Sequence, residues 1–188
     1  MRNYWKHVSA AGIVAALACA GTAQAAPTQG TFGATSQGSI TISASVPSRA
    51  QITGLSDVSF TNQDPASAAS NAQNVCVFSN TSGKKSNITA TGNSGGAVGG
   101  TAFTIGGTGL TAVPYTVEWA QTSGAASGTS LVSTTALTGQ ASTATTPTCA
   151  SGPATTATLF VKMSTAALQA MQSGTTYSGT LTLLVGPE

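Results

Sequence analysis

The residues that could do acid–base, metal or nucleophilic chemistry are few and widely spaced in this chain. Its one histidine is His7, and its four carboxylates are Asp57, Asp64, Glu118 and Glu188. A Ser-His-Asp or Cys-His site needs a histidine base, and glycoside hydrolysis needs two neighbouring carboxylates. The pattern therefore predicts no enzyme, and it offers no catalytic, metal-binding or cofactor-binding residue.

The isolated carboxylates have structural explanations. Asp57 and Asp64 stand at expected turns, where Asp side chains accept hydrogen bonds from the local backbone. Glu118 alternates with apolar residues and is expected to point outward from a strand. Next to Trp119 it could also form a platform for a sugar ring, but a core tryptophan beside a solvated glutamate is the commoner arrangement and is the one we expect.

Residues 1–25 are expected to be a secretory signal peptide. Arg2 and Lys6 form a positive start, an apolar stretch too short to span a bilayer follows, and residues 23–25 (Ala-Gln-Ala) suit signal peptidase. A membrane anchor and a lipoprotein modified at Cys19 are the alternatives. The remainder, about 160 residues, is long enough for one domain with a core, and no later segment is expected to cross a membrane.

Without the leader, the chain is close to neutral. Four basic residues balance the four acidic ones: Arg49, Lys84, Lys85 and Lys162. Such a chain cannot form a basic surface for nucleic acid or for an anionic membrane. Low charge also removes a common guard against self-association, as suits a protein that assembles.

Two cysteines remain after the leader is removed, Cys76 and Cys149. An even pair in an exported protein predicts a disulfide. No CxxC pair or histidine accompanies them, so a redox or metal role is not expected. The bridge would close a loop of about 70 residues, worth roughly 4 kcal/mol in the loop-entropy account.

A strand-like segment stands apart near the N-terminus of the mature chain. Residues 39–46 alternate apolar and hydroxyl side chains before Pro47, and residues 26–37 lack any periodicity. The apolar positions of this segment are Ile40, Ile42, Ala44 and Val46. Such a strand must bury its apolar face, either on the sheet of its own chain or on another molecule.

The rest of the chain predicts an all-β sandwich. A hairpin is expected from residues 74–79 and 87–91, and a short helix over residues 166–171. Loops are expected at residues 62–71, 92–100, 122–130 and 141–156. Further strands are expected at residues 51–60, 101–105, 113–120, 131–137, 157–163 and 177–185.

Two segments resemble a known family. Residues 39–47, Ser-Ile-Thr-Ile-Ser-Ala-Ser-Val-Pro, resemble the opening strand of major pilins of colonization-factor (alpha-type) fimbriae. Residues 174–183, Gly-Thr-Thr-Tyr-Ser-Gly-Thr-Leu-Thr-Leu, are similar to the last strand of many chaperone–usher subunits. The cysteine pair and the ending, residues 185–188 (Val-Gly-Pro-Glu), depart from the family's pattern.

The resemblance implies an immunoglobulin-like sandwich that lacks one strand and is completed by donor-strand exchange. The chain would then comprise a signal peptide (1–25), a flexible extension with the donor strand (26–50) and a pilin-like domain (51–188). The side chains implied to fill the groove of the next subunit are Ile40, Ile42, Ala44 and Val46. The implied partners are other copies of this chain or related pilins, a periplasmic chaperone and an outer-membrane usher.

The sequence thus favours a structural subunit of a bacterial surface fibre, exported through the periplasm to a fimbria that supports adhesion. The alternative is a self-complete exported β-sandwich that binds a carbohydrate or another ligand through its loops. Neighbouring genes for a chaperone and an usher would favour the first. An extracellular enzyme is a distant third, because no cluster of reactive side chains supports it.

Overall fold

The structure is a computed structural model that describes residues 25–93 and 103–188. The described chain forms an N-terminal unit that ends at Val46 and a domain, Pro47–Glu188. Almost all of the expected signal peptide and most of the expected glycine-rich loop at residues 92–100 lie outside the described residues.

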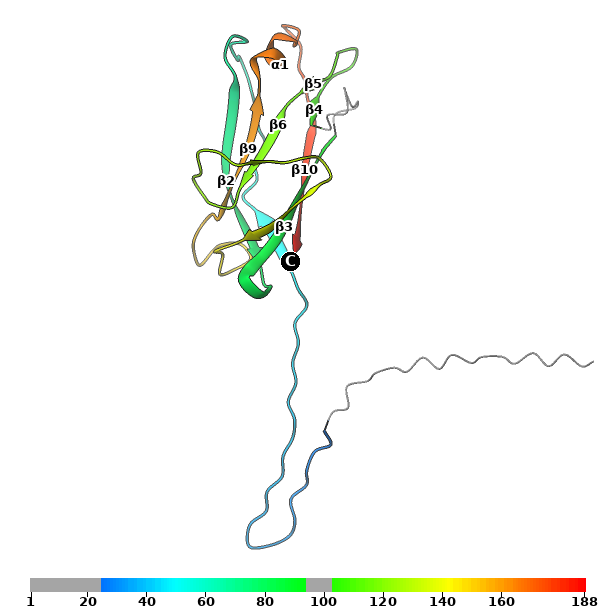
Figure 1. The fold of residues 1–188 in the computed structure, drawn as a ribbon, viewed down its shortest axis with the longest axis vertical. Coiled ribbons are helices and arrows are strands. Elements are labelled where there is room, and N and C mark those ends of the chain that lie inside the picture. Colours follow the sequence, from blue (N-terminus) through cyan, green and yellow to red (C-terminus); the bar gives the residue numbers. More distant parts are fainter. Residues whose placement is uncertain (1–24, 94–102) are drawn as a thin grey trace, which may run out of the picture. The chain divides into compact units, whose positions relative to one another are not determined.

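The domain is an all-β sandwich, as predicted (Figure 1). One sheet has the strand order β1-β2-β9-β6-β7, a second has the order β10-β3-β8, and β4 pairs with β5. All pairings are antiparallel. The strands are β1 (Ala50–Thr53), β2 (Ala69–Ser79), β3 (Lys85–Asn93), β4 (Thr104–Ile105), β5 (Val113–Pro114), β6 (Thr116–Ala120), β7 (Thr129–Ser130), β8 (Ala136–Ala141), β9 (Ala157–Met163) and β10 (Thr180–Pro187).

The core lies between the two larger sheets. Val77 of β2, Trp119 of β6 and Leu159 of β9 face it from one side, and Ile88 and Ala90 of β3 face it from the other. Alternate residues of a strand point to opposite faces, so these positions follow the period-2 pattern of the sequence. Trp119 is buried in this core, as one of the two explanations of the Glu118–Trp119 pair required.

The central strand β2 changes partner along its length. Its first part pairs with β9 from Ala69 to Val75, and its last four residues pair with β1. Beyond Val75, two side-chain hydroxyl groups bond to the edge of β2 that no longer pairs with β9. Thr156 accepts from the Val77 N–H, and Ser142 donates to the Val77 carbonyl. Strand β2 therefore keeps hydrogen bonds on that side after β9 ends.

The predicted hairpin of residues 74–79 and 87–91 is wrong. Strand β2 belongs to the five-stranded sheet, whereas β3 pairs with β10 and β8 in the other sheet. A short 3₁₀ turn, η1 (Ser82–Lys84), carries the chain from one layer to the other. Each of the two strands has one apolar face. Such strands can pair as a hairpin in one sheet, or they can lie in opposite sheets and face each other across the core, so their alternation does not distinguish the two arrangements.

Several element boundaries differ from expectation. Residues 69–71 belong to β2 rather than to a loop, residues 55–60 form no strand, and the expected strand 113–120 is divided into β5 and β6. The weak strand signal at residues 131–137 corresponds to β8, which starts later, at Ala136. The local sequence indicates which residues can form a strand. Whether they do so depends on the neighbouring strand with which they pair, and the local sequence does not determine this.

Two short features near residue 165 match expectation. Strand β9 spans Ala157–Met163, and helix α1 (Thr165–Gln169) follows it directly. The Ser164 side chain caps the helix by accepting a hydrogen bond from the Ala167 N–H. The helix buries Ala167 and Leu168 against the core.

Cys76 and Cys149 form the predicted disulfide. Cys76 points to the outer face of the five-stranded sheet, since its neighbours Val75 and Val77 face the core. There it packs with Ala144 and Cys149 in a second, small apolar cluster. The bridge therefore fastens the long loop before β9 to the outside of the sheet.

Replacing both cysteines, C76A with C149A, should lower the free energy of unfolding by about 2–4 kcal/mol. The bridge joins residues 73 positions apart, so its loss frees a large loop in the unfolded chain. Urea unfolding of the double variant and of wild type, each with and without reductant, measures the effect. Reductant should shift the midpoint of wild type only; equal midpoints for wild type and the variant without reductant would contradict it.

Candidate functional site

A long groove of about 1140 Å³ opens on the core of the domain. One wall is formed by residues 55–63, which follow β1, and the other by residues 171–181, which lead into β10. The floor consists of inward-facing side chains of β9: Leu159, Val161 and Met163. The groove thus lies where the two sheets would otherwise close over the core.

The apolar side chains along this groove are only partly covered. They pack against the buried core but keep part of their surface exposed. They come from both walls, from β4 and from β10: Val58, Phe60, Ile105, Met171, Tyr177, Leu181 and Leu183. Burying such surface is the main source of stability in a domain, so the core is unfinished along this line.

Side-chain hydrogen bonds hold the first wall in place. The Gln73 amide of β2 accepts from the Ser56 N–H at 2.8 Å and donates to the Ser56 carbonyl at 3.2 Å. Gly54 allows the turn between β1 and this wall, because its φ of +84° disfavours other residues. The wall is therefore fastened to β2 by an amide side chain and not by a backbone ladder.

The second wall is fastened in a similar way. The Gln172 N–H donates to the Tyr177 hydroxyl, and Thr175 donates to the Gln172 carbonyl. These bonds close a tight loop between α1 and β10. Side-chain hydrogen bonds thus hold part of each wall.

Strand β10 borders the groove, and among the described strands only β3 pairs with it. It pairs with β3 on one side and stands at the end of its sheet. Its inward side chains, Leu181, Leu183 and Val185, are half-buried, and Leu184 on the opposite face is exposed. An exposed strand edge carries unpaired N–H and C=O groups that can accept one more strand.

Within the groove the electrostatics are almost neutral. Of the described residues that line it, only Asp57 is charged. Burial raises the pKa of the Tyr115 phenol in the groove lining, so this group stays protonated at neutral pH. Such a lining offers little electrostatic compensation for a charged group, so it favours an uncharged occupant.

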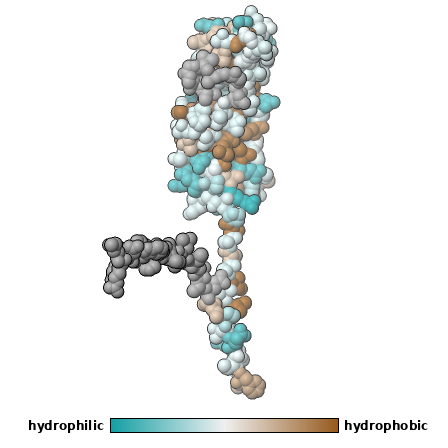
Figure 2. Space-filling view, turned by 90° about the vertical axis from the view of Figure 1, so that its right-hand side faces the viewer, coloured by the Kyte–Doolittle hydropathy of each residue, from teal (hydrophilic) through white to brown (hydrophobic). Residues whose placement is uncertain are grey.

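The N-terminal unit contains the segment that was expected to act as a donor strand. Ile40, Ile42 and Val46 are 76%, 85% and 83% exposed, and Ala44 between them is exposed too. Hydrophobic residues recur at intervals along the described extension in Figure 2. Residues 40–46 take part in no described β-ladder, whereas Ser39 forms a bridge with Thr28. Donation of this segment to another molecule stays a prediction.

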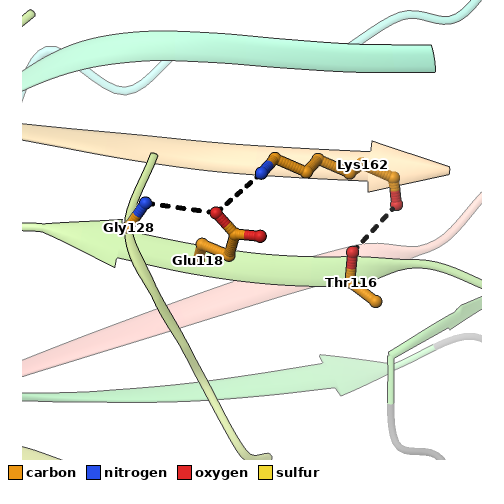
Figure 3. Close-up of polar contacts among 4 residues, drawn as sticks. All are labelled: Thr116, Glu118, Gly128 and Lys162. Carbon is orange, nitrogen blue, oxygen red and sulfur yellow. Dashed lines mark hydrogen bonds and ion pairs between the residues drawn. The ribbon is translucent and has the colours of Figure 1, made fainter. Parts of the chain in front are cut away.

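Glu118 has a structural role on the outer face of the five-stranded sheet, the outward orientation that was expected (Figure 3). Its carboxylate lies 2.7 Å from the Lys162 ammonium and accepts from the Gly128 N–H at 3.2 Å. The hydrogen bond from Lys162 holds the pKa of Glu118 below its ordinary value, and the bond from Gly128 adds to the effect. The pair ties the loop after β6 to β9.

Gly128 is required at this contact. A Cβ atom there would lie 2.6 Å from the backbone carbon of Trp119, which cannot move without disturbing β6. Lys162 also lies over the Phe160 ring, 5.2 Å from its centre. No local pattern indicates that Gly128 and Lys162 meet Glu118, because the three residues are brought together only by folding.

The other candidate residues are not brought together as a reactive site. The Asp64 carboxylate accepts from the Ala66 N–H, the local turn bond that was expected, while Asp57 lies on the groove wall. Residues 25–93 and 103–188 contain no group of three or more His, Cys, Asp or Glu side chains placed to hold a metal ion. The same residues include no helix long and apolar enough to cross a membrane.

The comparisons with known proteins are limited. No family model and no curated protein matches the chain. Among solved structures, it is similar to a chain described with a chaperone–tip adhesin complex vital for CFA/I fimbriae biogenesis, at a TM-score of 0.45 and 13% identity. The match covers 74% of this chain and 41% of that one, so this chain spans about two fifths of its length. We therefore base the function on the groove and the N-terminal segment.

E118Q should lower the free energy of unfolding by about 1 kcal/mol at pH 7, since it breaks a partly exposed ion pair that also carries a hydrogen bond. The folded state lowers the pKa of Glu118 from 4.5, so the contribution is present above that value and lost as the pH falls through the lowered pKa. Urea unfolding at pH 7 and pH 3 measures it.

The matched control is D57N, which removes an exposed carboxylate without such partners, and it should stay within 0.5 kcal/mol of wild type at both pH values, about the size of an ordinary surface change. The difference between wild type and E118Q should become smaller as the pH falls from 7 to 3. A difference of the same size at both pH values would show that Glu118 acts through packing and not through its charge.

Proposed function

We propose that this chain is a structural subunit of a bacterial surface fibre, assembled by β-strand donation. Residues 39–46 of one copy would fill the groove of the next. The observation that carries the proposal is the pairing, on one chain, of an open apolar groove with a detached apolar-faced segment. Each copy then has one donor and one acceptor, which is what a head-to-tail fibre requires.

Length and chemistry of the two parts agree. The donor run has eight residues, as does β10, and eight residues of strand span about 26 Å. Ile40, Ile42, Ala44 and Val46 lie on one face of such a strand, and the hydroxyl side chains between them would face solvent. The run carries no charged residue, which matches the nearly neutral groove.

The energy available is comparable to the stability of a whole domain. Burying three large aliphatic side chains contributes roughly 1.5–3 kcal/mol each, or about 5–9 kcal/mol in total before ordering costs. Small domains are stable by about 5–15 kcal/mol. The donated strand would also pair the free edge of β10. A subunit without a donor is therefore expected to be much less stable.

The same logic supports the proposed partners. A subunit with an open groove needs a temporary cover before it meets the next copy, and β-strand addition by a periplasmic chaperone would supply one. An outer-membrane usher would then exchange that strand for residues 39–46 of another subunit. In this proposal the protein is exported, does no catalysis, and supports adhesion as part of the fibre.

Deletion of residues 39–46 should abolish polymers and leave a monomer. Its melting temperature should be at least 10 °C below that of the wild-type polymer, because the burial energy of the donated strand is lost. A free peptide of the same residues should restore most of that loss. Light scattering after size-exclusion chromatography and thermal unfolding with and without peptide measure the two effects. An unchanged melting temperature would contradict the proposal.

I42D should act almost like the deletion, because it places a charge in an apolar groove. The matched control is S43D, which adds the same charge on the opposite face of the strand, where it stays in solvent. Polymer yield should fall at least tenfold in I42D and less than twofold in S43D. Equal yields, or a wild type that remains a stable monomer at high concentration, would favour the self-complete sandwich that binds a ligand.

A further inference from the structure

The first residues of the domain are held by one side chain, Asn80. Its Nδ2 donates to the Pro47 carbonyl at 2.9 Å, and its Oδ1 accepts from the Arg49 N–H at 2.6 Å. The Asn80 N–H also donates to the Arg49 carbonyl at 3.1 Å. These contacts join the start of the domain to the end of β2, and we refer to them as the Asn80 clamp.

The clamp makes residues 47–49 a continuation of β1. The register of β1 with β2 ends in the pair Ala50 and Ser79, and Arg49 lies opposite Asn80 as the next pair would. The Asn80 amide supplies the bonds that a neighbouring strand would otherwise give. Residues 47–49 are therefore held in line with β1 and do not turn back.

This geometry bears on which groove receives the donor strand. Only three residues, 47–49, separate the donor run from Ala50 of β1. For residues 39–46 to enter the groove of their own domain, the chain would have to reverse within those three residues, in the manner of a three-residue hairpin loop. That reversal would break the hydrogen bonds of the Asn80 clamp.

We propose that Asn80 is a positioning residue that favours donation between molecules over self-insertion. It does so by fixing residues 47–49 against the turn that self-insertion requires. This inference rests on the proposed function, because it presupposes that residues 39–46 fill a groove. No described contact gives Asn80 a role in the groove itself, so its effect should fall on the choice of partner.

The test compares N80A with wild type in the mature chain, refolded at several concentrations. Loss of two side-chain hydrogen bonds should raise the ratio of monomer to polymer about tenfold. The monomer should be as heat-stable as the polymer and should not bind the free peptide of residues 39–46, because its groove is already filled. The control is Q51A, which removes an exposed amide side chain from β1 and should behave like wild type.

Three outcomes overturn the inference: N80A polymerises like wild type, its monomer binds the peptide, or its monomer melts like the 39–46 deletion. The last two would mean an empty groove. If N80A does not fold, N80D provides the test. This variant keeps the acceptor for the Arg49 N–H and loses the donor to the Pro47 carbonyl, so it should raise the ratio of monomer to polymer severalfold. If I42D itself still polymerises, the proposed function fails, whatever Asn80 does.

Discussion

A sandwich of two sheets is stable only if its core is covered along every line where the sheets meet, and in this domain one such line is open. Residues 55–63 on one side and β10 on the other leave the inward side chains of β9 beneath a groove. The apolar side chains at its borders stay half-exposed. Removal of this surface from water would stabilise the domain, and no strand among its described residues covers it.

The other parts of the domain surface are closed by specific contacts. The disulfide and the hydroxyl groups of Ser142 and Thr156 fix the long loop before β9 to the outside of β2. The Glu118–Lys162 pair, with Gly128, fixes the loop after β6. A chain with so few charges relies on hydroxyl and amide side chains for this purpose, and these make directed hydrogen bonds without adding repulsion between copies.

The groove differs from these closed parts because its walls are fixed while the apolar side chains between them stay partly exposed. Both walls of the groove are held by amide and hydroxyl contacts, which limit the freedom of the loops that form them. The apolar run near the N-terminus lies just before residues 47–49, which are held by Asn80. The groove and the apolar run are thus parts of one chain, and three residues, 47–49, connect the run to the first strand of the domain.

From the sequence we correctly predicted the fold class, the disulfide, the helix after β9 and the turn role of Asp64, and the alternation of residues 39–46 was visible there too. These features follow from local periodicity, from capping residues and from the number of cysteines. All three can be read without knowledge of which distant segments meet. The three-dimensional arrangement was needed to show that β2 and β3 belong to different sheets and that Lys162 and Gly128 meet Glu118. It was also needed to locate the groove, between residues 55–63 and the segment that leads into β10. The alternation of a strand determines which of its faces is apolar, but it does not determine which other strand it pairs with. A groove forms where neighbouring segments do not pair, so it too depends on the arrangement of distant parts of the chain. Asn80 shows the same limit, because its partners lie more than thirty positions away and are brought to it by the β1–β2 ladder.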